Sequence, residues 1–243
     1  MNTPNGLGGC NWYASQMGWR LLRGNVMVEG NLDVRYFTRA ATLHEVATGL
    51  SLLGKDLSVF SPGSGDLGGT FGIAERFPVL HGMARVDLDS NGKAKYRVVA
   101  LLDDDNHGRA AARLMAQANR SMQENAQLFL LKRRMPRRSR DAKPLTQHLK
   151  EVNAEFGTLD CVIEDLVDPT ICDLYAEQFP EHVKGKSQTT GSGRHSSWLD
   201  DGKFGLVRFV EQNAEYEEMQ QIIEVLKSLR FYLGLPPDGI VRP

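Results

Sequence analysis

Short apolar runs alternate with longer amphipathic stretches over the first half of the chain. The apolar runs are rich in valine, leucine and phenylalanine, which is typical of buried strands. The stretches between them carry apolar residues at helical spacing. Strands that alternate with helices predict an α/β fold with a mostly parallel sheet flanked by helices. The expected strands are 25–29, 56–61, 98–102 and 128–132, and the expected helices are 32–47, 69–82 and 107–125.

The second half of the chain is less regular and is expected to be mainly helical. An amphipathic helix is expected at 216–233, and the Gly-, Ser- and Thr-rich stretch 184–197 is typical of a loop. Further helices are expected at 12–22, 144–156 and 170–179, with a short strand at 159–163. These elements predict a lead-in helix in residues 1–23, a core in 24–140, and an extension in 141–243 that completes the site and covers the sheet.

One apolar run leads directly into three carboxylates, Asp103, Asp104 and Asp105. Because strand side chains alternate between faces, Asp103 and Asp105 are expected to point to the same side. Ligands bind at the carboxyl ends of strands in open α/β sheets, and two carboxylates held together favour a divalent cation such as Mg²⁺. The alternative is a solvated turn, since Asp, Asn and Gly are also common turn formers.

A second strand end carries another pair of acids. The expected strand 25–29 ends at Glu29, and Gly30 permits a tight turn into the next helix, with Asn31 as its N-cap. Glu29 and Asp33 are four residues apart, so they can share one face if the helix begins at once. Two strand ends that each deliver a pair of acids describe a metal site better than two unrelated turns do.

Together these motifs resemble the TOPRIM domain of topoisomerases, primases, RecR-type proteins and overcoming-lysogenisation-defect (OLD) nucleases. A Val-Glu-Gly motif at Glu29 is followed farther along by Asp-x-Asp-x-x-Gly at Asp103. The OLD-like branch is the most similar, because its first motif reads Glu-Gly-x-x-acid, matched here by Glu29, Gly30 and Asp33. The similarity covers roughly residues 24–135.

The resemblance implies a TOPRIM (Rossmann-like) fold and a nuclease that hydrolyses phosphodiester bonds with two Mg²⁺ or Mn²⁺ ions. OLD-like proteins have a later Ile-Glu element, matched by Ile163 and Glu164, and a downstream lysine, matched by Lys203. The lysine would stabilise developing negative charge. The implied metal ligands are Glu29, Asp33, Asp103, Asp105 and Glu164, and the implied catalytic residues are Glu29, Asp103, Asp105 and Lys203.

Positive charge is concentrated in one segment, 132–140, where six of nine residues are cationic. The acids cluster elsewhere, which predicts a polyanion-binding ridge beside an acidic centre. The alternative is a solvated or disordered loop, because Pro136 and the arginines would not pack. Nucleic acid is the expected partner, with DNA favoured over RNA. The expected contacts are Lys132, Arg133, Arg134, Arg137, Arg138 and Arg140.

Composition is that of an ordinary globular protein. With 243 residues, 41% of them hydrophobic and 24% charged, the chain can bury its own core. It has no transmembrane-length apolar run and no signal pattern, so no membrane partner is expected. Cys10, Cys161 and Cys172 form no CxxC pair, which argues against a zinc knuckle or a disulfide framework and favours a cytoplasmic location.

A glycine-rich loop supports a competing interpretation. Gly63, Gly65 and Gly68 spell GxGxxG, which would suit an NAD-dependent oxidoreductase if Asp87 or Asp89 bound the ribose. The motif alone is unspecific, and those aspartates fall in an expected hairpin. The loop also lacks the lysine of a P-loop, which excludes nucleotide hydrolysis by this chain.

The remaining expectations concern partners and function class. OLD-like TOPRIM domains usually follow an ATPase, so a separate ATPase partner is expected, as in a regulated antiphage effector, with 216–233 and 184–197 as docking elements. Whether the chain forms a homo-oligomer stays open. The alternative from another class is a non-catalytic TOPRIM scaffold that binds nucleic acid in repair or recombination. His107 is expected to cap a helix or face solvent.

Overall fold

A four-stranded parallel sheet lies at the centre of the computed structural model, which describes residues 8–63 and 68–241. The strands are β1 (Gly24–Val28), β3 (Leu57–Phe60), β4 (Arg97–Leu102) and β5 (Leu128–Leu130), in the order β3-β1-β4-β5. β1 and β4 are neighbours, with Val28 opposite Leu101. The order runs outward in both directions from this pair, so the β1–β4 boundary is the point at which such sheets bind ligands.

Side chains of each strand alternate between two separate cores, as the pleat requires. In β1, Val26 and Val28 enter one core and Met27 enters the other. In β4, Leu101 enters the first core and Ala100 the second. All these residues are buried, which explains why the strands read as continuous apolar runs in the sequence.

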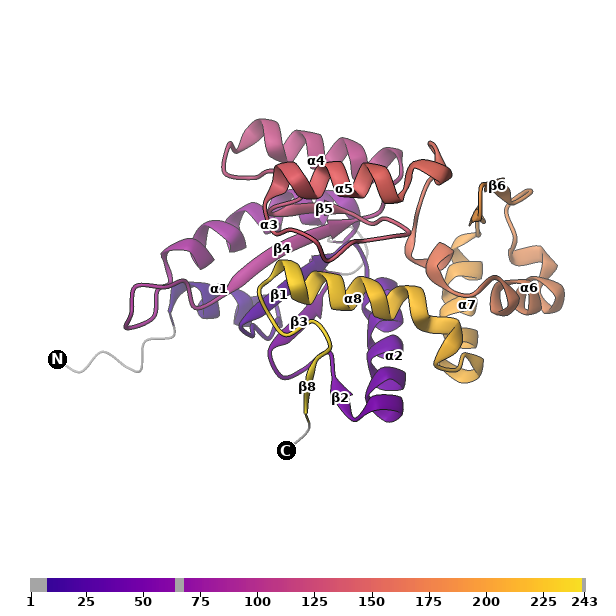
Figure 1. The fold of residues 1–243 in the computed structure, drawn as a ribbon, viewed down its shortest axis with the longest axis horizontal. Coiled ribbons are helices and arrows are strands. Elements are labelled where there is room, and N and C mark those ends of the chain that lie inside the picture. The colour runs from indigo at the N-terminus through magenta and orange to yellow at the C-terminus, as the bar shows by residue number, and fades with distance from the viewer. Residues whose placement is uncertain (1–7, 64–67, 242–243) are drawn as a thin grey trace.

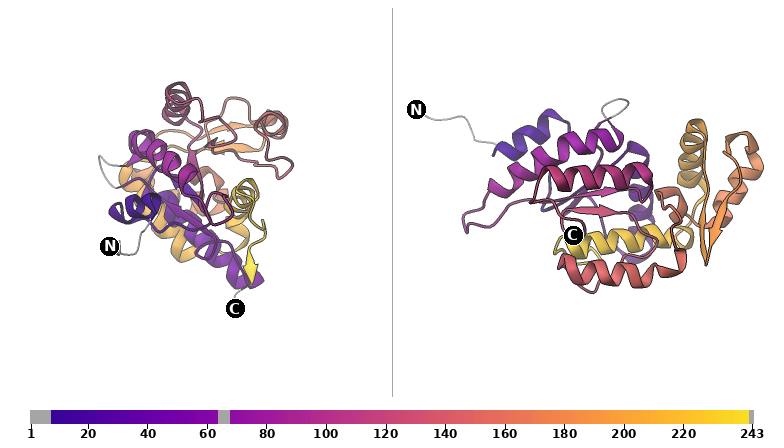
Figure 2. Two further views of the ribbon diagram at one scale, coloured as in Figure 1. Left: turned by 90° about the vertical axis from the view of Figure 1, so that its left-hand side faces the viewer. Right: turned by 90° about the horizontal axis from the view of Figure 1, so that it is seen from above.

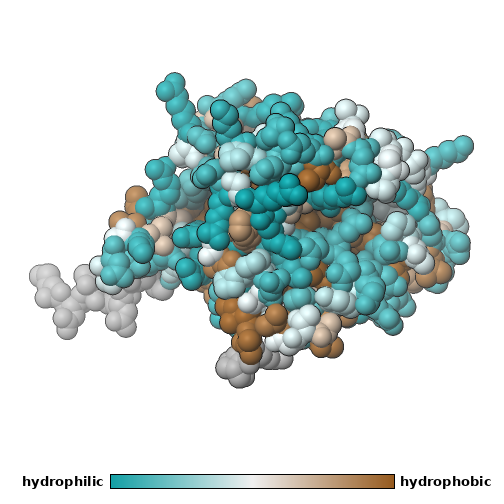
Figure 3. Space-filling view, in the orientation of Figure 1, coloured by the Kyte–Doolittle hydropathy of each residue, from teal (hydrophilic) through white to brown (hydrophobic). Residues whose placement is uncertain are grey.

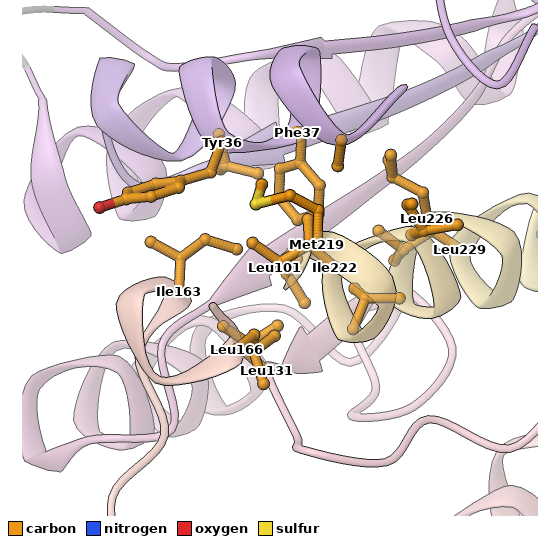
Figure 4. Packing of buried hydrophobic residues seen from close by; sticks show 14 of the residues in the cluster. Tyr36, Phe37, Leu101, Leu131, Ile163, Leu166, Met219, Ile222, Leu226 and Leu229 are labelled. Carbon is orange, nitrogen blue, oxygen red and sulfur yellow. The ribbon is translucent and has the colours of Figure 1, made fainter. Parts of the chain in front are cut away.

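Helices cover both faces of the sheet (Figures 1 and 2). One face carries α2 (Asn31–Thr48), α5 (Ala142–Val152) and α8 (Gln220–Tyr232), and the other carries α1 (Gly9–Gln16), α3 (Gly69–Val86) and α4 (Asn106–Ala118). Figure 4 shows Phe37 of α2 beside Ile222 of α8 over the sheet, whereas the ring of Tyr36 extends toward Ile163. Burial of such side chains, at about 25 cal/mol per Å² of apolar surface, drives this packing.

A smaller lobe lies beyond one end of the sheet (Figure 2). It follows a 3₁₀ helix, Ile163–Leu166, and consists of α6 (Pro169–Gln178), the antiparallel pair β6 (Gln188–Thr190) and β7 (Gly193–His195), and α7 (Asp200–Asn213). α7 packs against both α6 and α2 and so ties the lobe to the sheet domain. A second short pair, β2 (Leu50–Ser51) and β8 (Ile240–Val241), joins the C-terminal segment to α2.

The prediction of an α/β fold with a parallel sheet is confirmed, but several local predictions were wrong. The expected strand 159–163 is only a single bridge between Cys161 and Asp104, followed by 3₁₀ helix. The expected loop 184–197 contains the β6–β7 hairpin, because Gly191 turns the chain with φ +60°. No helix was expected at α7, since its two glycines weaken the helical pattern. These glycines are needed for packing, because a Cβ on Gly202 would lie 2.5 Å from the His182 carbonyl oxygen.

The amphipathic helix predicted at 216–233 also needs a correction. It is observed as a 3₁₀ turn, Glu217–Met219, followed by α8. Ile222, Ile223 and Leu226 are completely buried in the main core, so the apolar face of α8 serves the fold and is not free to dock a partner. No helix in residues 8–63 and 68–241 has the length and apolar character to cross a membrane.

Candidate acid and lysine site

Two of the predicted acids meet where the sheet's strand order reverses. Glu29 follows β1 and Asp103 follows the neighbouring β4. The backbone N–H of Asp103 donates to Oε1 of Glu29 at 3.0 Å, so the two strand ends are joined through this carboxylate. Both acids remain partly exposed, which leaves them accessible to a ligand.

The turn from β1 into α2 places Asp33 at the same end of the sheet as Glu29. Gly30 is the N-cap of α2, and Oδ2 of Asp33 accepts its backbone N–H at 2.9 Å. A carboxylate in the first turn of a helix is also favoured by the helix dipole. The sequence expectation that Glu29 and Asp33 share one side of the turn agrees with their electrostatic interaction, since Asp33 raises the pKa of Glu29.

Glu164 and Lys203 reach the same place from the C-terminal half. Glu164 lies in the 3₁₀ helix and is 4% exposed, whereas Lys203 lies in the first turns of α7 and is partly exposed. The pKa of the Lys203 ammonium is raised chiefly by Glu164, with Asp103 and Asp33 adding to the effect against the cost of burial. The lysine is therefore a charged counterion to this group of acids.

The four carboxyls have raised pKa values because each is largely withdrawn from solvent and lies within electrostatic range of the others. Burial is the largest cause for each, and it raises the pKa of Glu29 to about 8 and that of Asp33 to about 7, with repulsion from neighbouring acids contributing. The pKa of Asp103 lies well above its ordinary value, and that of Glu164 is also raised. Such shifts mean that Lys203 alone does not neutralise the acids. We call Glu29, Asp33, Asp103, Glu164 and Lys203 the acid–lysine cluster.

The cluster suits a hard cation that retains water. Within residues 8–63 and 68–241, no group of three or more His, Cys, Asp or Glu is arranged as a ready metal cage. Mg²⁺ does not require one, because it is commonly held by one or two carboxylates together with waters and substrate phosphate oxygens. The oxygen-only donor set fits such an ion, because a bound cation would offset the mutual repulsion that raises the pKa values of these acids, and it does not fit a zinc site.

Asp105 differs from Asp103 in its structural role. β4 ends at Leu102, and Asp105 is the N-cap of α4, where Oδ1 accepts the Gly108 N–H at 2.7 Å. Asp105 nevertheless raises the pKa of Glu29, so its charge acts on the cluster. Gly108 is required at its position, because a Cβ there would lie 2.0 Å from the Asp103 carbonyl oxygen. The spacing Asp-x-Asp-x-x-Gly thus has a local structural reason.

Asp104 is held by cations outside the cluster. Lys132 Nζ lies 2.5 Å from Oδ2, and Arg109 Nη1 lies 3.1 Å from Oδ1. Arg109 also pairs with Asp160 at 2.7 Å. This side of the strand end is therefore a balanced ion-pair network.

Most cations of the predicted nucleic-acid ridge have partners within the protein. Lys132 pairs with Asp104, as described, and Arg133 is buried and donates to the carbonyls of Asp160 and Arg194. Arg134 pairs with Glu155, Arg137 pairs with Glu224, and Arg140 lies over the Phe231 ring. Arg138 is exposed. Figure 3 shows that the surface over α5 and α8 is mostly hydrophilic, without one continuous apolar patch. Because Arg133 is buried and bonded to backbone carbonyls, its role in nucleic-acid binding is disfavoured. The role of Arg138 stays a prediction.

The residues of the glycine-rich and aspartate motifs that the structure describes have ordinary structural roles. Residues 64–67 of the glycine loop, which include Gly65, lie outside the described residues. Gly69 donates its N–H to the Glu29 carbonyl at 2.9 Å, so the loop supports the strand end. Asp87 pairs with Lys95, and Asp89 accepts backbone N–H groups in its own turn, which leaves neither placed to bind a ribose. His107 is exposed in the first turn of α4, as expected.

Three polar residues near the cluster were not found from the sequence. Asp165 follows Glu164 and binds His195, and neither residue has a motif that marks it. Tyr36 is fully buried, and its hydroxyl has no hydrogen-bond partner in the described part of the chain. Glu164 and Asp33 add to the effect of burial in raising the pKa of Tyr36, so this phenol lies near the acids and remains protonated.

In comparisons with known proteins, no family model, no curated protein and no solved structure matches the chain. The resemblance to TOPRIM domains therefore stays a prediction that rests on the motifs themselves. What the chain offers on its own terms is a parallel α/β sheet whose strand ends gather four poorly neutralised acids and one lysine.

Proposed function

We propose that this protein is a metal-dependent nuclease that hydrolyses phosphodiester bonds at the acid–lysine cluster. The most direct support is the hydrogen bond that joins Glu29 to Asp103 at neighbouring strand ends, together with the electrostatic effects through which Asp33, Glu164 and Lys203 alter the pKa values of these acids. The position at the strand-order reversal is where α/β sheets bind ligands. TOPRIM-like chemistry with Mg²⁺ or Mn²⁺ suits these residues.

The residues divide into holding and stabilising roles. Glu29 and Asp103 are the first candidates to hold a metal, because they are partly exposed and joined at neighbouring strand ends. Asp33 and Glu164 supply further negative charge, with Asp105 at the edge. Lys203 would stabilise the charge that develops on the phosphate during cleavage. When bound, Mg²⁺ activates a water and neutralises the leaving oxygen.

The class of substrate is proposed on charge grounds. Lys203 and the exposed Arg138 can meet phosphate oxygens, whereas most other cations of 132–140 are occupied. We propose DNA as the main substrate, with RNA as an alternative. Control by a separate ATPase also stays a proposal, and its docking surface must lie elsewhere than the buried face of α8.

The first experiment is a cleavage assay on purified protein. Supercoiled plasmid, linear duplex, single-stranded DNA and tRNA are incubated with Mg²⁺, Mn²⁺ or excess EDTA. We expect cleavage that requires the metal and that is lost in Glu29→Gln. The matched control is Glu177→Gln, which changes an exposed carboxyl on α6. Binding of DNA without cleavage under every condition would instead favour the scaffold alternative. Cleavage at full rate in excess EDTA would contradict the metal-dependent mechanism.

A further inference from the structure

We propose that His195 is a catalytic residue that donates a proton to the leaving oxygen of the phosphodiester. The inference rests on the proposed nuclease function and adds a residue for which the sequence shows no motif. His195 lies at the end of β7, in the lobe beyond the carboxyl ends of the sheet strands. It would act beside Lys203, which enters the site from the same lobe.

The imidazole is held firmly from one side. Nδ1 of His195 donates to Oδ2 of Asp165 at 2.8 Å, and the Asp165 side chain is only 2% exposed. Asp165 is itself fixed by the backbone N–H groups of Val162 at 3.0 Å and Ser196 at 3.2 Å. A carboxylate that fixes one ring nitrogen sets the tautomer and orientation of the other. The geometry therefore presents Nε2 as the working nitrogen.

Nε2 is available for a ligand. Its only hydrogen-bond partner in the described ranges is Oγ of Ser197 at 3.4 Å, which is long for a hydrogen bond. The His195 side chain keeps 14% of its surface exposed, so a phosphate oxygen can approach it. A serine that rotates away leaves Nε2–H free to donate.

Asp165 also connects His195 to the acid–lysine cluster. Glu164 and Asp165 are consecutive in one 3₁₀ helix, and the first serves the cluster while the second holds His195. The charge of His195 lowers the pKa of Glu164, opposing its burial, so the imidazole lies within electrostatic range of the site. A further observation agrees with the role of an acid: Asp165 raises the pKa of His195, which favours the protonated ring near neutrality.

In the proposed step, water attacks the phosphorus and His195 protonates the leaving oxygen. The attacking water forms the new P–O bond and releases its proton to solvent, while the P–O bond to the leaving alkoxide breaks. The proton on Nε2 moves to that leaving oxygen and yields an alcohol. The neutral imidazole that remains takes a proton from solvent before the next turnover. Asp165 keeps its charge throughout and only orients the ring.

A purely structural role is the main alternative, since the pair also ties the β6–β7 hairpin to the 3₁₀ helix. The two roles differ in one measurable way, because a general acid matters only when the leaving group needs a proton. The test therefore compares His195→Gln on a DNA oligonucleotide and on the p-nitrophenyl phosphodiester of thymidine, whose nitrophenolate leaves without a proton.

We expect His195→Gln to lose about 10²–10⁴-fold in rate on the oligonucleotide and to lose little on the nitrophenyl ester. The control is His182→Gln in the same lobe, whose ring bonds the Tyr175 hydroxyl at 2.6 Å. It should affect both substrates equally. Should the Gln variant fail to fold, His195→Ala assayed with added imidazole provides a second measurement, and recovery of oligonucleotide cleavage is the expected result.

Equal losses on both substrates, or no recovery with imidazole, would overturn the role of His195 while leaving the nuclease proposal intact. If wild-type protein cleaves neither substrate with Mg²⁺ or Mn²⁺, the proposed function itself is contradicted, and the role of His195 falls with it. The binding of Mn²⁺ to the His195→Gln protein is measured by titration. Retained binding shows that the variant has kept its acid–lysine cluster.

Discussion

Asp103 and Asp104 are consecutive residues at one strand end, yet they lie in opposite electrostatic environments. Asp103 faces three other acids and a single lysine, and its pKa is raised well above its ordinary value. Asp104 lies between Lys132 and Arg109, within hydrogen-bond distance of both. Both follow the end of β4, and as consecutive residues they meet different neighbours. One side chain meets acids and the other meets cations.

The contrast separates the acids that we propose bind a ligand from the acids that stabilise the fold. A carboxylate that already has two cationic partners gains little from a metal ion, whereas one crowded by like charges gains a great deal. Functional sites commonly contain residues whose pKa values are strongly perturbed by burial and neighbours. The same criterion places Asp103 in the proposed site and Asp104 in the scaffold.

The largest expected effect is on cleavage. Asp103→Asn should reduce the rate by roughly 10³-fold, which corresponds to about 4 kcal/mol of barrier, because a proposed metal ligand is lost. Asp104→Asn should change the rate by less than about tenfold, equivalent to under 1.4 kcal/mol of barrier. Both are measured on one DNA substrate with saturating Mg²⁺. Equal losses in the two variants would remove the distinction between the two acids.

The second effect is on folding and has the reverse order. Asp104→Asn should lower the free energy of unfolding by about 1–3 kcal/mol, because it weakens two charge-assisted hydrogen bonds and leaves two cations short of a partner. Asp103→Asn should be neutral or stabilising, since an amide cannot ionise among the neighbouring acids that already raise the pKa of Asp103. Urea unfolding monitored by circular dichroism measures both. A more stable Asp104→Asn protein would contradict the scaffold role.

Much of this comparison was accessible from the sequence, but only where the interactions are local. The apolar run before Asp103 predicted its strand end, and the turn at Gly30 predicted that Glu29 and Asp33 belong together. Glu164 and Lys203 were identified only by resemblance, because nothing in their spacing indicates that a separate lobe brings them to the sheet. In the structure Glu164 is the main cause of the raised pKa of Lys203, so the two lie within electrostatic range of each other, and their role in a site stays a prediction.

The rest depends on contacts between residues far apart in the chain. Lys132 lies 28 residues from Asp104 in sequence, and Arg137 lies 87 residues from Glu224. A run of cations therefore looked like a free ridge, although tertiary contacts occupy most of it. The His195–Asp165 pair was missed for the same reason, since its members are 30 positions apart in the sequence.

The third expected effect is on the pH dependence of stability. Burial and repulsion raise the pKa of Glu29 from 4.5 to about 8, so the native state holds this proton to a higher pH than the unfolded chain does. The contribution of Glu29 to the free energy of unfolding is therefore greatest below about pH 4.5, and it falls as the pH rises toward 8. Asp33 acts in the same direction, with its pKa raised to about 7.

Thermal unfolding at acidic, neutral and alkaline pH tests this effect. In Glu29→Gln, the melting temperature should fall less between about pH 4.5 and pH 8 than it does in the wild type. Mg²⁺ should stabilise the wild type most at the alkaline end of this range, where the acids are ionised. Glu177→Gln, on the exposed surface, is the control and should follow the wild type. A wild-type melting temperature that rises with pH over this range, or that ignores Mg²⁺, would argue against crowded carboxylates at the site.

The smallest expected effect extends the comparison to the cations of 132–140. Arg138 is exposed, whereas the Arg133 side chain is 5% exposed and donates to two backbone carbonyls. Arg138→Gln should weaken DNA binding modestly for all sequences and reduce the slope of log K against log salt by up to about 0.9, the value for one phosphate contact. Arg133→Gln should lower stability instead and leave the salt slope unchanged, provided that binding is measured by fluorescence anisotropy below its melting temperature. A change of slope in Arg133→Gln but not in Arg138→Gln would mean that Arg133 leaves its buried position to contact DNA. In that case the arginine with partners in the protein, and not the exposed one, would be the one that binds phosphate.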